Sequence, residues 1–378
     1  MNILLYSWYF FPTEIGGLEK YLLNLTNLLK KNHKVVLLIS RENNIKIKNV
    51  KIYYVPTLKT KISFLGLLSQ VISIALFLPY IIMKEKIELI SSYVPTANST
   101  LTLLISKFMR VPNLINIRGY RPDISLFRRV MGDIGLFFTN NIFINSKDFK
   151  KRYVKQSFLP KSFINKKNWI FIPNGIKFKF WEKKSSIDDK KYDLIFVGHL
   201  KPKHRFVAKG FDVLYKALER ISHEYNLKLH VVVLGPYEKE LIRREIADVD
   251  LSYFEFHGMV KSKKKIRDFY YLSKIYVLPS THEGMPNSLM EAMATGLPSI
   301  ASNVGAVPEL IDNNVNGFIF PNRNEMELSK IILKLMKDTE LREKIGKAAK
   351  KKMRDNFSWD IIINDVIHKF IKIKCRKV

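Results

Sequence analysis

The segment from Pro279 to Ser302 holds the residues best suited to chemistry in this sequence. Pro286 fits the first turn of a helix, where its missing N–H group costs no hydrogen bond, and Gly296 fits the position just after a helix end. The sequence therefore predicts a helix over 287–295. Its first turn would present free N–H groups and the positive end of the helix dipole, which together suit a diphosphate. The residues that would carry these N–H groups are Met285, Asn287 and Ser288.

Two glutamates flank this predicted anion site. Glu283 precedes the helix, and Glu291 lies roughly one turn inside it. A carboxylate accepts hydrogen bonds from hydroxyl groups, so the pair could hold a nucleotide sugar from its two ends. Either residue alone is as readily a solvated surface glutamate. Their joint placement around the helix start favours a sugar-nucleotide site.

Short apolar runs alternate with stretches of helical period in the first half of the chain. Leucines recur at helix spacing within 17–30, which predicts a helix there. This alternation is typical of a parallel sheet with crossover helices. The runs that we expect to be strands are Ile3–Tyr6, Val35–Ser40, Lys51–Val55, Glu88–Ser91, Asn113–Ile117 and Asn141–Ile144.

The same α/β pattern restarts after Lys191 and predicts a second domain, with a helix near Asp212–Tyr225. The stretch Asn174–Lys190 is rich in Lys, Ser and Asp, which makes it the best candidate for a linker. We expect an N-terminal domain over 1–175, a C-terminal domain over 176–358 and a helix over 359–378. The strands expected in the second domain are Asp193–Val197, Leu229–Leu234, Tyr253–His257, Ile275–Pro279 and Ser299–Ala301.

Glu283 and Glu291 form an E-x7-E pattern, and the chain around them resembles glycosyltransferase family four, most densely from Gly198 to Pro321. The resemblance implies a GT-B fold, in which two Rossmann-like doubly wound domains face each other across a cleft that holds the active site. It also implies sugar transfer from a nucleotide-diphosphate sugar with retention at the anomeric carbon, with no metal and no other cofactor. The other stretches that carry the resemblance are Gly16-Gly17, Ile172–Ile176, Phe196–Gly198, Lys209–Asp212, Phe256–Val260, Val304–Glu309 and Asn316-Gly317.

The resemblance also assigns roles to individual residues. Glu291 would hold the donor ribose, Glu283 would contact the transferred sugar, and Lys209 with a nearby arginine would neutralise the leaving diphosphate. Departure of the diphosphate builds negative charge, so fixed cations there stabilise the transition state more than the ground state. The last helix would cross back onto the first domain. The remaining residues expected at the donor are Gly16, Gly17, Gly198, His199, Val260, Met285, Asn287 and Ser288.

Two positions depart from the family's pattern. The phosphate loop of the family usually reads Val-Gly-Arg, whereas this chain has His199 in the third place, and Arg205 is the candidate that replaces the arginine. Many members carry a histidine in the first domain where this chain has Arg118. Arginine could bind the donor diphosphate or an anionic acceptor, but it cannot accept a proton near neutral pH. The rivals of Arg205 are Lys201, Lys203 and a protonated His199.

The formal net charge of +30 is large for a chain of 378 residues. A basic face could dock on anionic lipid, where each Lys or Arg contributes about 1 kcal/mol. It could instead bind nucleic acid, or the lysines could only form a solvated surface. The sequence holds no recognisable nucleic-acid-binding module, which argues against nucleic acid as a partner.

The apolar segment Ile62–Met83 is long enough to span a bilayer, but polar residues interrupt it and Pro79 breaks its end. We predict a helix of the first domain, with contact between this helix and a membrane surface as the alternative. The single cysteine, Cys375, cannot form an internal disulfide, and the N-terminus lacks the features of a signal peptide. We expect a cytoplasmic protein, with peripheral attachment to the inner face of the plasma membrane as a further expectation.

These observations predict a retaining glycosyltransferase that modifies a glycan or a lipid-linked acceptor in bacterial capsule, exopolysaccharide or lipopolysaccharide synthesis. One alternative is a sugar-nucleotide epimerase on the same fold, which would turn over the donor without an acceptor. Another is a non-catalytic basic membrane-binding protein, which would have no affinity for nucleotide sugars. Asp248 and Asp250 form a D-x-D string that could suggest a metal, but its place away from Glu283 favours a solvated loop, and no zinc ligand set is readable.

Overall fold

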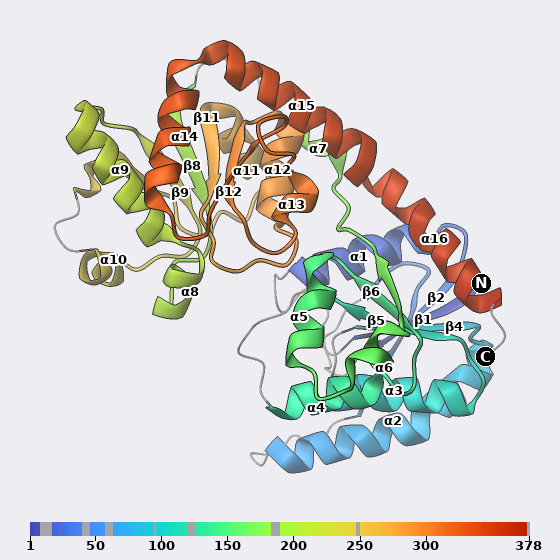
Figure 1. The fold of residues 1–378 in the computed structure, drawn as a ribbon. Coiled ribbons are helices and arrows are strands. Elements are labelled where there is room, and N and C mark those ends of the chain that lie inside the picture. The colour runs from blue at the N-terminus through green and yellow to red at the C-terminus, as the bar shows by residue number, and fades with distance from the viewer. Residues whose placement is uncertain are drawn as a thin grey trace. The chain divides into compact units, whose positions relative to one another are not determined.

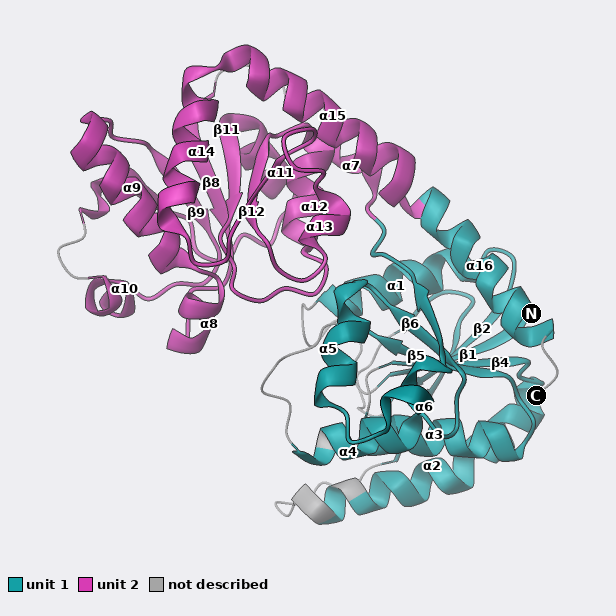
Figure 2. Cartoon of the chain, viewed as in Figure 1, with its two compact units in different colours: residues 1–175, 360–378 teal, residues 176–359 magenta. Residues whose placement is uncertain are grey.

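The computed structural model divides the chain into two compact units (Figure 2). Unit 1 comprises Met1–Gly175 together with Asp360–Val378, and unit 2 comprises Ile176–Trp359. The predicted site residue Gly16 lies outside the residues that the structure describes, as does Asp248 of the D-x-D string. The described residues are 1–7, 17–39, 46–56, 63–93, 96–118, 126–182, 190–246 and 250–375.

Unit 1 is built on a seven-stranded parallel sheet with the order β3-β2-β1-β4-β5-β6-β7. Its inner strands are buried along their length, which is why the sequence shows continuous apolar runs there. All six strands expected in this half are present, and β7 is an addition that sequence reasoning missed. The strands are β1 Asn2–Ser7, β2 Lys34–Ile39, β3 Lys51–Tyr54, β4 Leu89–Tyr93, β5 Asn113–Ile117, β6 Asn141–Ile144 and β7 Asn168–Phe171.

Helices link the strands of unit 1 and cover its sheet (Figure 1). The last helix, α16, packs on this unit: the ring of Phe370 stacks on that of Phe143 with centroids 5.9 Å apart, and Lys374 forms an ion pair with Glu88. The first residue of α16, Trp359, belongs to unit 2. The helices are α1 Gly17–Leu29, α2 Ser63–Glu85, α3 Ala97–Phe108, α4 Leu126–Gly135, α5 Asp148–Gln156, α6 Lys161–Asn165 and α16 Trp359–Cys375.

Unit 2 is built on a six-stranded parallel sheet with the order β10-β9-β8-β11-β12-β13. The five expected strands are present, and β13 is the strand that sequence reasoning missed. The strands are β8 Tyr192–Val197, β9 Val231–Leu234, β10 Phe254–Phe256, β11 Ser273–Leu278, β12 Ser299–Ser302 and β13 Phe318–Phe320.

Nine α-helices lie among the described residues of unit 2, in addition to the start of α16. Helix α9 packs against α14, and α12 packs against both α11 and α15 (Figure 1). The nine helices are α7 Phe178–Trp181, α8 Lys203–Ala208, α9 Phe211–Tyr225, α10 Lys239–Glu245, α11 Lys263–Leu272, α12 Asn287–Thr295, α13 Val307–Leu310, α14 Glu325–Lys337 and α15 Thr339–Phe357.

The expected linker Asn174–Lys190 is wrong in its first half. Helix α7 occupies part of it and belongs to unit 2, where the side chains of Phe178 and Trp181 are buried. Arg267 fixes this helix by donating a hydrogen bond to the carbonyl of Phe180 over 2.9 Å. The prediction failed because it was based on the many lysines and serines of this stretch and not on the aromatic residues of its FKFW segment, which pack on the second domain.

Candidate active site

Most of the predicted donor residues lie at the carboxyl edge of the sheet of unit 2, whereas Gly17 belongs to unit 1. The strand order reverses between β8 and β11, and ligands of doubly wound sheets bind where this reversal occurs. Gly198 follows the end of β8, and the loop that carries Glu283 follows the end of β11. The sheet topology therefore brings together two stretches that lie far apart in the sequence.

Lys209 and Glu283 form a direct ion pair at this edge. The Nζ atom of Lys209 lies 2.6 Å from Oε1 of Glu283, and the two side chains are 25% and 12% exposed. Gly210 makes this approach feasible: its φ of +64° is left-handed, and a Cβ there would lie only 1.9 Å from the carbonyl oxygen of Pro279. Thr281 also donates its backbone N–H to the carbonyl of Ala208 over 2.9 Å. The backbone around the lysine is thus fastened to the loop that bears the glutamate.

A second glycine fastens the same loop from the side of β12. Gly305 has a φ of +56°, and a Cβ there would lie 2.1 Å from the carbonyl oxygen of Glu283. The next residue, Ala306, donates its N–H to the carbonyl of Gly284 over 2.7 Å. The position of Glu283 is therefore set by backbone contacts from two neighbouring loops.

Helix α12 spans Asn287–Thr295, which confirms the helix predicted from sequence. Pro286 is its N-cap residue, and Gly296 ends it in the left-handed conformation with a φ of +82°. Met285 is buried just before the helix, whereas Asn287 and Ser288 are half-buried in its first turn. Pro286 has no polar side chain that could cap the helix, and the residues predicted for the anion site lie at this helix start.

Glu291 and Ser288 contact two buried tyrosines. The hydroxyl of Tyr270, in α11, lies 3.2 Å from the carbonyl oxygen of Ser288 and 3.5 Å from Oε2 of Glu291. The hydroxyl of Tyr276, in β11, donates to Oγ of Ser288 over 2.8 Å. Burial, reinforced by the charge of Glu291, raises the pKa of Tyr270 far above its usual value, so its hydroxyl stays a donor. Sequence reasoning missed both tyrosines because their runs look like ordinary core.

The loop after β8 is shaped by close packing. A Cβ on Gly198 would lie 3.0 Å from the ring of Phe196, and a Cβ on Gly235 would lie 2.0 Å from the carbonyl oxygen of Gly198. His199 is exposed, and Arg205 is half-buried within α8. Among the rival cations Lys201 and Lys203 are exposed, and Nζ of Lys203 lies 2.9 Å from Glu245.

Val260 lines a pocket of about 740 Å³ between the end of β10 and helix α11. The ring of Phe269 and the imidazole of His257 form part of its wall, with their centroids 4.5 Å apart. Among the predicted site residues within the described ranges, Val260 alone lines this pocket.

Arg118 lies at the end of β5 in unit 1, where a buried polar cluster surrounds it. Its Nη1 donates to Oδ1 of Asn174 over 3.0 Å, and its guanidinium carbon lies 3.3 Å from the ring centroid of Tyr21. Burial lowers the pKa of Arg118 and raises that of Tyr21. Gly17 is the first residue of α1, whereas its predicted companion Gly16 lies outside the described part of the chain.

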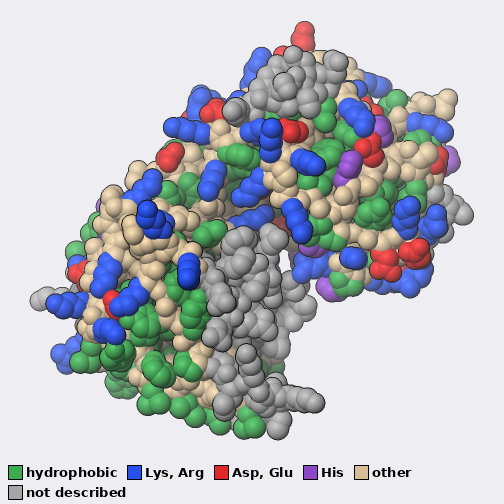
Figure 3. Space-filling view, turned by 180° about the vertical axis from the view of Figure 1, so that it is seen from behind, with side chains coloured by type: hydrophobic (Ala, Val, Ile, Leu, Met, Phe, Trp, Pro, Cys, Tyr) green, Lys and Arg blue, Asp and Glu red, His purple; other side chains and the backbone are tan. Residues whose placement is uncertain are grey.

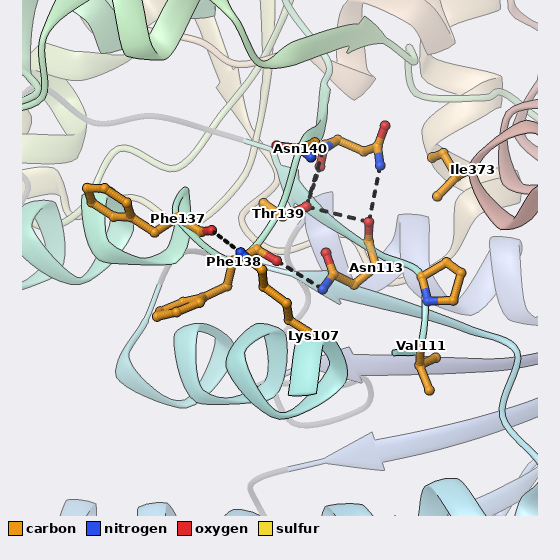
Figure 4. A pocket seen from close by; sticks show the side chains of 10 residues that line it. Lys107, Val111, Asn113, Phe137, Phe138, Thr139, Asn140 and Ile373 are labelled. Carbon is orange, nitrogen blue, oxygen red and sulfur yellow. Dashed lines mark hydrogen bonds between the residues drawn. The ribbon is translucent and has the colours of Figure 1, made fainter. Parts of the chain in front are cut away.

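A pocket of about 250 Å³ in unit 1 lies at the opposite edge of the sheet (Figure 4). Asn113 and Asn141, which begin β5 and β6, line it together with Ile373 of α16. Arg118 follows the other end of β5, so this pocket is not the place where that arginine would meet a ligand.

The D-x-D string gives no indication of a metal site in the part that the structure covers. The carboxylate of Asp250 accepts a hydrogen bond from the N–H of Ser252 over 2.9 Å and caps a short helical turn. Across the described residues, no group of three or more His, Cys, Asp or Glu side chains could hold a metal ion.

Comparison with known proteins identifies this architecture. Residues 177–352 match the family model of the glycosyl transferases group 1. An uncharacterized glycosyltransferase of Methanocaldococcus jannaschii is 28% identical over 363 residues, which cover 95% of each chain. The capsular polysaccharide biosynthesis glycosyltransferase CapM of Staphylococcus aureus is 27% identical over 355 residues, which cover 89% of each chain.

A solved structure shows the same fold over the whole chain. HepE of Anabaena, crystallised in complex with UDP, superposes with a TM-score of 0.77 at 17% identity and covers 98% of this chain and 100% of its own. Two parallel α/β units of this kind define a GT-B fold, the architecture of many sugar transferases. The match of residues 177–352 to the glycosyl transferases group 1, together with relatives that are named glycosyltransferases, agrees with the resemblance inferred from Glu283 and Glu291.

Proposed function

We propose that this glycosyltransferase is retaining and metal-independent, and that unit 2 binds a nucleotide-diphosphate sugar as donor. The observation that carries the proposal is the ion pair of Lys209 and Glu283 beside the first turn of α12. The related fold of HepE has been crystallised with UDP and with UDP-glucose, which supports a donor of this class. The donor residues Gly198, His199, Met285, Asn287 and Ser288 remain predictions, as do Gly16 and Gly17.

The reaction needs a cation beside the diphosphate that leaves the donor. The bond between the anomeric carbon and the β-phosphate oxygen breaks, and a bond from the acceptor oxygen to the same carbon forms. The leaving diphosphate gains negative charge, which the ammonium of Lys209 stabilises together with the helix start of α12. Glu283 holds this ammonium in place and, in the complex, accepts a hydrogen bond from the transferred sugar. Glu291 accepts hydrogen bonds from the ribose.

The acceptor proton passes to the departing phosphate oxygen on the same face of the sugar. This route needs no protein base, which suits a chain with Arg118 where many relatives carry histidine. Arg205 is the second cation of the proposal. Lys203 is the weaker rival because its charge is already compensated by Glu245.

The proposed acceptor is a glycan or a lipid-linked sugar of a bacterial surface polysaccharide, and the proposed location is the cytoplasm. CapM is named for capsular polysaccharide biosynthesis, and a relative from Erwinia amylovora is named for amylovoran biosynthesis. Arg118 offers a buried guanidinium in unit 1 for an anionic group of the acceptor or of the donor phosphates.

Calorimetry with UDP, GDP, ADP and dTDP, followed by a transfer assay with the sugar of the nucleotide that binds, tests the proposal. Lys209→Gln should lower kcat by about 100-fold to 1,000-fold, the usual loss when a fixed stabiliser of developing charge is removed. Lys216→Gln, on the exposed side of α9, is the matched control and should keep full activity. EDTA should leave turnover unchanged, and the product should keep the anomeric configuration of the donor.

Several outcomes would refute the proposal. Unchanged turnover in Lys209→Gln would remove this lysine from the reaction, and a product of inverted configuration would exclude retention. Conversion of the donor without any acceptor would instead indicate an epimerase. Absence of binding by all four nucleotides to the folded protein would exclude the donor class.

A further inference from the structure

Helix α2 carries a continuous apolar stripe on its outer side. Except for Phe77, which directly follows Leu76, the side chains of this stripe recur at intervals of three or four residues, so they share one face of the helix. These side chains are between 42% and 72% exposed, which is unusual for so many large apolar side chains on a single helix. The stripe consists of Leu65, Leu68, Ile72, Leu76, Phe77, Tyr80 and Met83.

The opposite side of α2 is fixed in the core of unit 1. Ile74, Leu78 and Ile81 are almost fully buried there. The buried amide of Asn98, in α3, donates a hydrogen bond to Oε1 of Gln70 over 2.8 Å. By length and composition, residues 68–85 could cross a membrane, and no other helix in the described part of the chain passes the same test. Because one side packs on the unit, the helix can only lie flat against a surface.

Exposed cations flank one end of the apolar stripe. Helices α2 and α3 lead into β4 and β5, so both end at the amino edge of the sheet of unit 1. Nζ of Lys84 lies 2.6 Å from the hydroxyl of Tyr80, which joins a cation to an aromatic ring at the margin of the stripe. Phe108 is 80% exposed at the end of α3. The other exposed cations at these two helix ends are Lys86, Lys107 and Arg110.

Negative charge along the same stretch is already compensated. Between residues 63 and 110 the acidic residues are Glu85 and Glu88. Glu85 pairs with Lys34 and Lys51, and Glu88 pairs with Lys374. The surface at this end therefore combines apolar side chains with uncompensated positive charge. Figure 3 shows the hydrophobic side chains gathered along the lower edge of unit 1, where α2 lies in Figure 1.

We propose that the α2 stripe and the cations at the ends of α2 and α3 dock unit 1 on a membrane surface that contains anionic lipid. Apolar side chains enter the boundary of the acyl chains while lysines and Tyr80 stay at the headgroups. A second copy of the chain is the poorer occupant, because each copy carries a net charge of +30 and the stripe is flanked by cations. The proposal stands apart from the donor chemistry, since it uses no residue of unit 2.

Flotation of the purified full chain with vesicles tests this docking. Vesicles of phosphatidylcholine alone are compared with vesicles that contain phosphatidylglycerol as well, and we expect strong binding to the second kind, weakened by salt. The double variant Ile72→Gln, Leu76→Gln should bind at least tenfold more weakly. The double variant Lys84→Gln, Lys86→Gln should lose at least tenfold on anionic vesicles, since each lysine contributes about fivefold.

The matched control is the double variant Val315→Gln, Met326→Gln, which removes two exposed apolar side chains from unit 2 and should bind vesicles like the wild type. Nucleotide binding should be the same in all variants, which separates this test from that of the proposed function. Equal flotation of the wild type and the α2 variant would overturn the proposal, as would failure to bind either vesicle. A dimer that the α2 variant dissociates would assign the stripe to a second copy. Binding that requires an added soluble protein would assign it to a protein partner.

Discussion

Glu85 at the end of α2 should stabilise unit 1 in a pH-dependent way. Its carboxylate is 3% exposed and lies 3.0 Å from Nζ of Lys34 and 2.5 Å from Nζ of Lys51. The hydroxyl of Tyr53 donates a further hydrogen bond to it. Burial alone would raise the pKa of Glu85, but these three partners outweigh it and lower the pKa from 4.5 to about 2.

The size of the effect follows from linkage. Each pKa unit corresponds to about 1.4 kcal/mol, so this change corresponds to about 3 kcal/mol of unfolding free energy. Both lysines are about half-exposed, so solvent screening reduces the expected value to about 2 kcal/mol. The folded-state pKa lies below the unfolded-state value. The contribution is therefore complete above pH 4.5 and disappears as the pH falls toward 2.

The contribution of Glu85 to the free energy of unfolding can be measured by urea unfolding of the Glu85→Gln variant, monitored by circular dichroism. At pH 7 the variant should be about 2 kcal/mol less stable than the wild type in the transition of unit 1, and the difference should shrink toward zero near pH 2. Glu343→Gln removes a carboxylate that is 65% exposed and should change stability by less than about 0.5 kcal/mol at any pH. A difference for Glu85→Gln that stays constant between pH 7 and pH 2.5 would refute the electrostatic reasoning.

Two further predictions concern the loops and tyrosines of unit 2. Gly305→Ala places a Cβ 2.1 Å from the carbonyl oxygen of Glu283, so it should lower both the melting temperature and turnover, the latter at least tenfold. Gly258→Ala, with a φ of +62° and open space around the new Cβ, should lose only about 1 to 2 kcal/mol of stability and keep activity; equal activity in both variants would contradict the clash. Tyr270→Phe removes a buried hydroxyl beside the proposed ribose-binding glutamate, so calorimetry should show weaker nucleotide binding by roughly threefold to tenfold. The hydroxyl of Tyr271 donates to the carbonyls of Trp181 and Glu182 at the end of α7, so Tyr271→Phe should bind nucleotide normally; an equal loss of binding in both tyrosine variants would point to a general loss of packing.

Much of the fold could be predicted from the sequence because its signals are local. Pro286 and Gly296 fix the ends of α12 through their own backbone preferences, so the predicted and observed helices agree. The eleven predicted strands are found because buried parallel strands are apolar along their length. Strands β7 and β13 are short and start or end among polar residues, so no long apolar run in the sequence indicates them.

The geometry of the site could be predicted only in part. The sequence motifs identify Lys209 and Glu283 as site residues. The ion pair between them, however, depends on the close approach of Gly210 to Pro279, which comes from a different strand end. Local sequence carries no information on such a long-range approach. Which side of α2 is exposed cannot be predicted from the sequence either, because both sides are apolar and packing on unit 1 determines which side is buried.

The chain passes from unit 1 into unit 2 and returns through α16, which gives the two units different folding requirements. Unit 2 is one continuous stretch, Ile176–Trp359, so all of its residues have been synthesised before α16 is complete. Unit 1 needs Phe370 and its neighbours from the far end of the same chain to cover Phe143. During synthesis unit 2 can therefore reach its native packing first, whereas unit 1 is complete only after α16 has been synthesised.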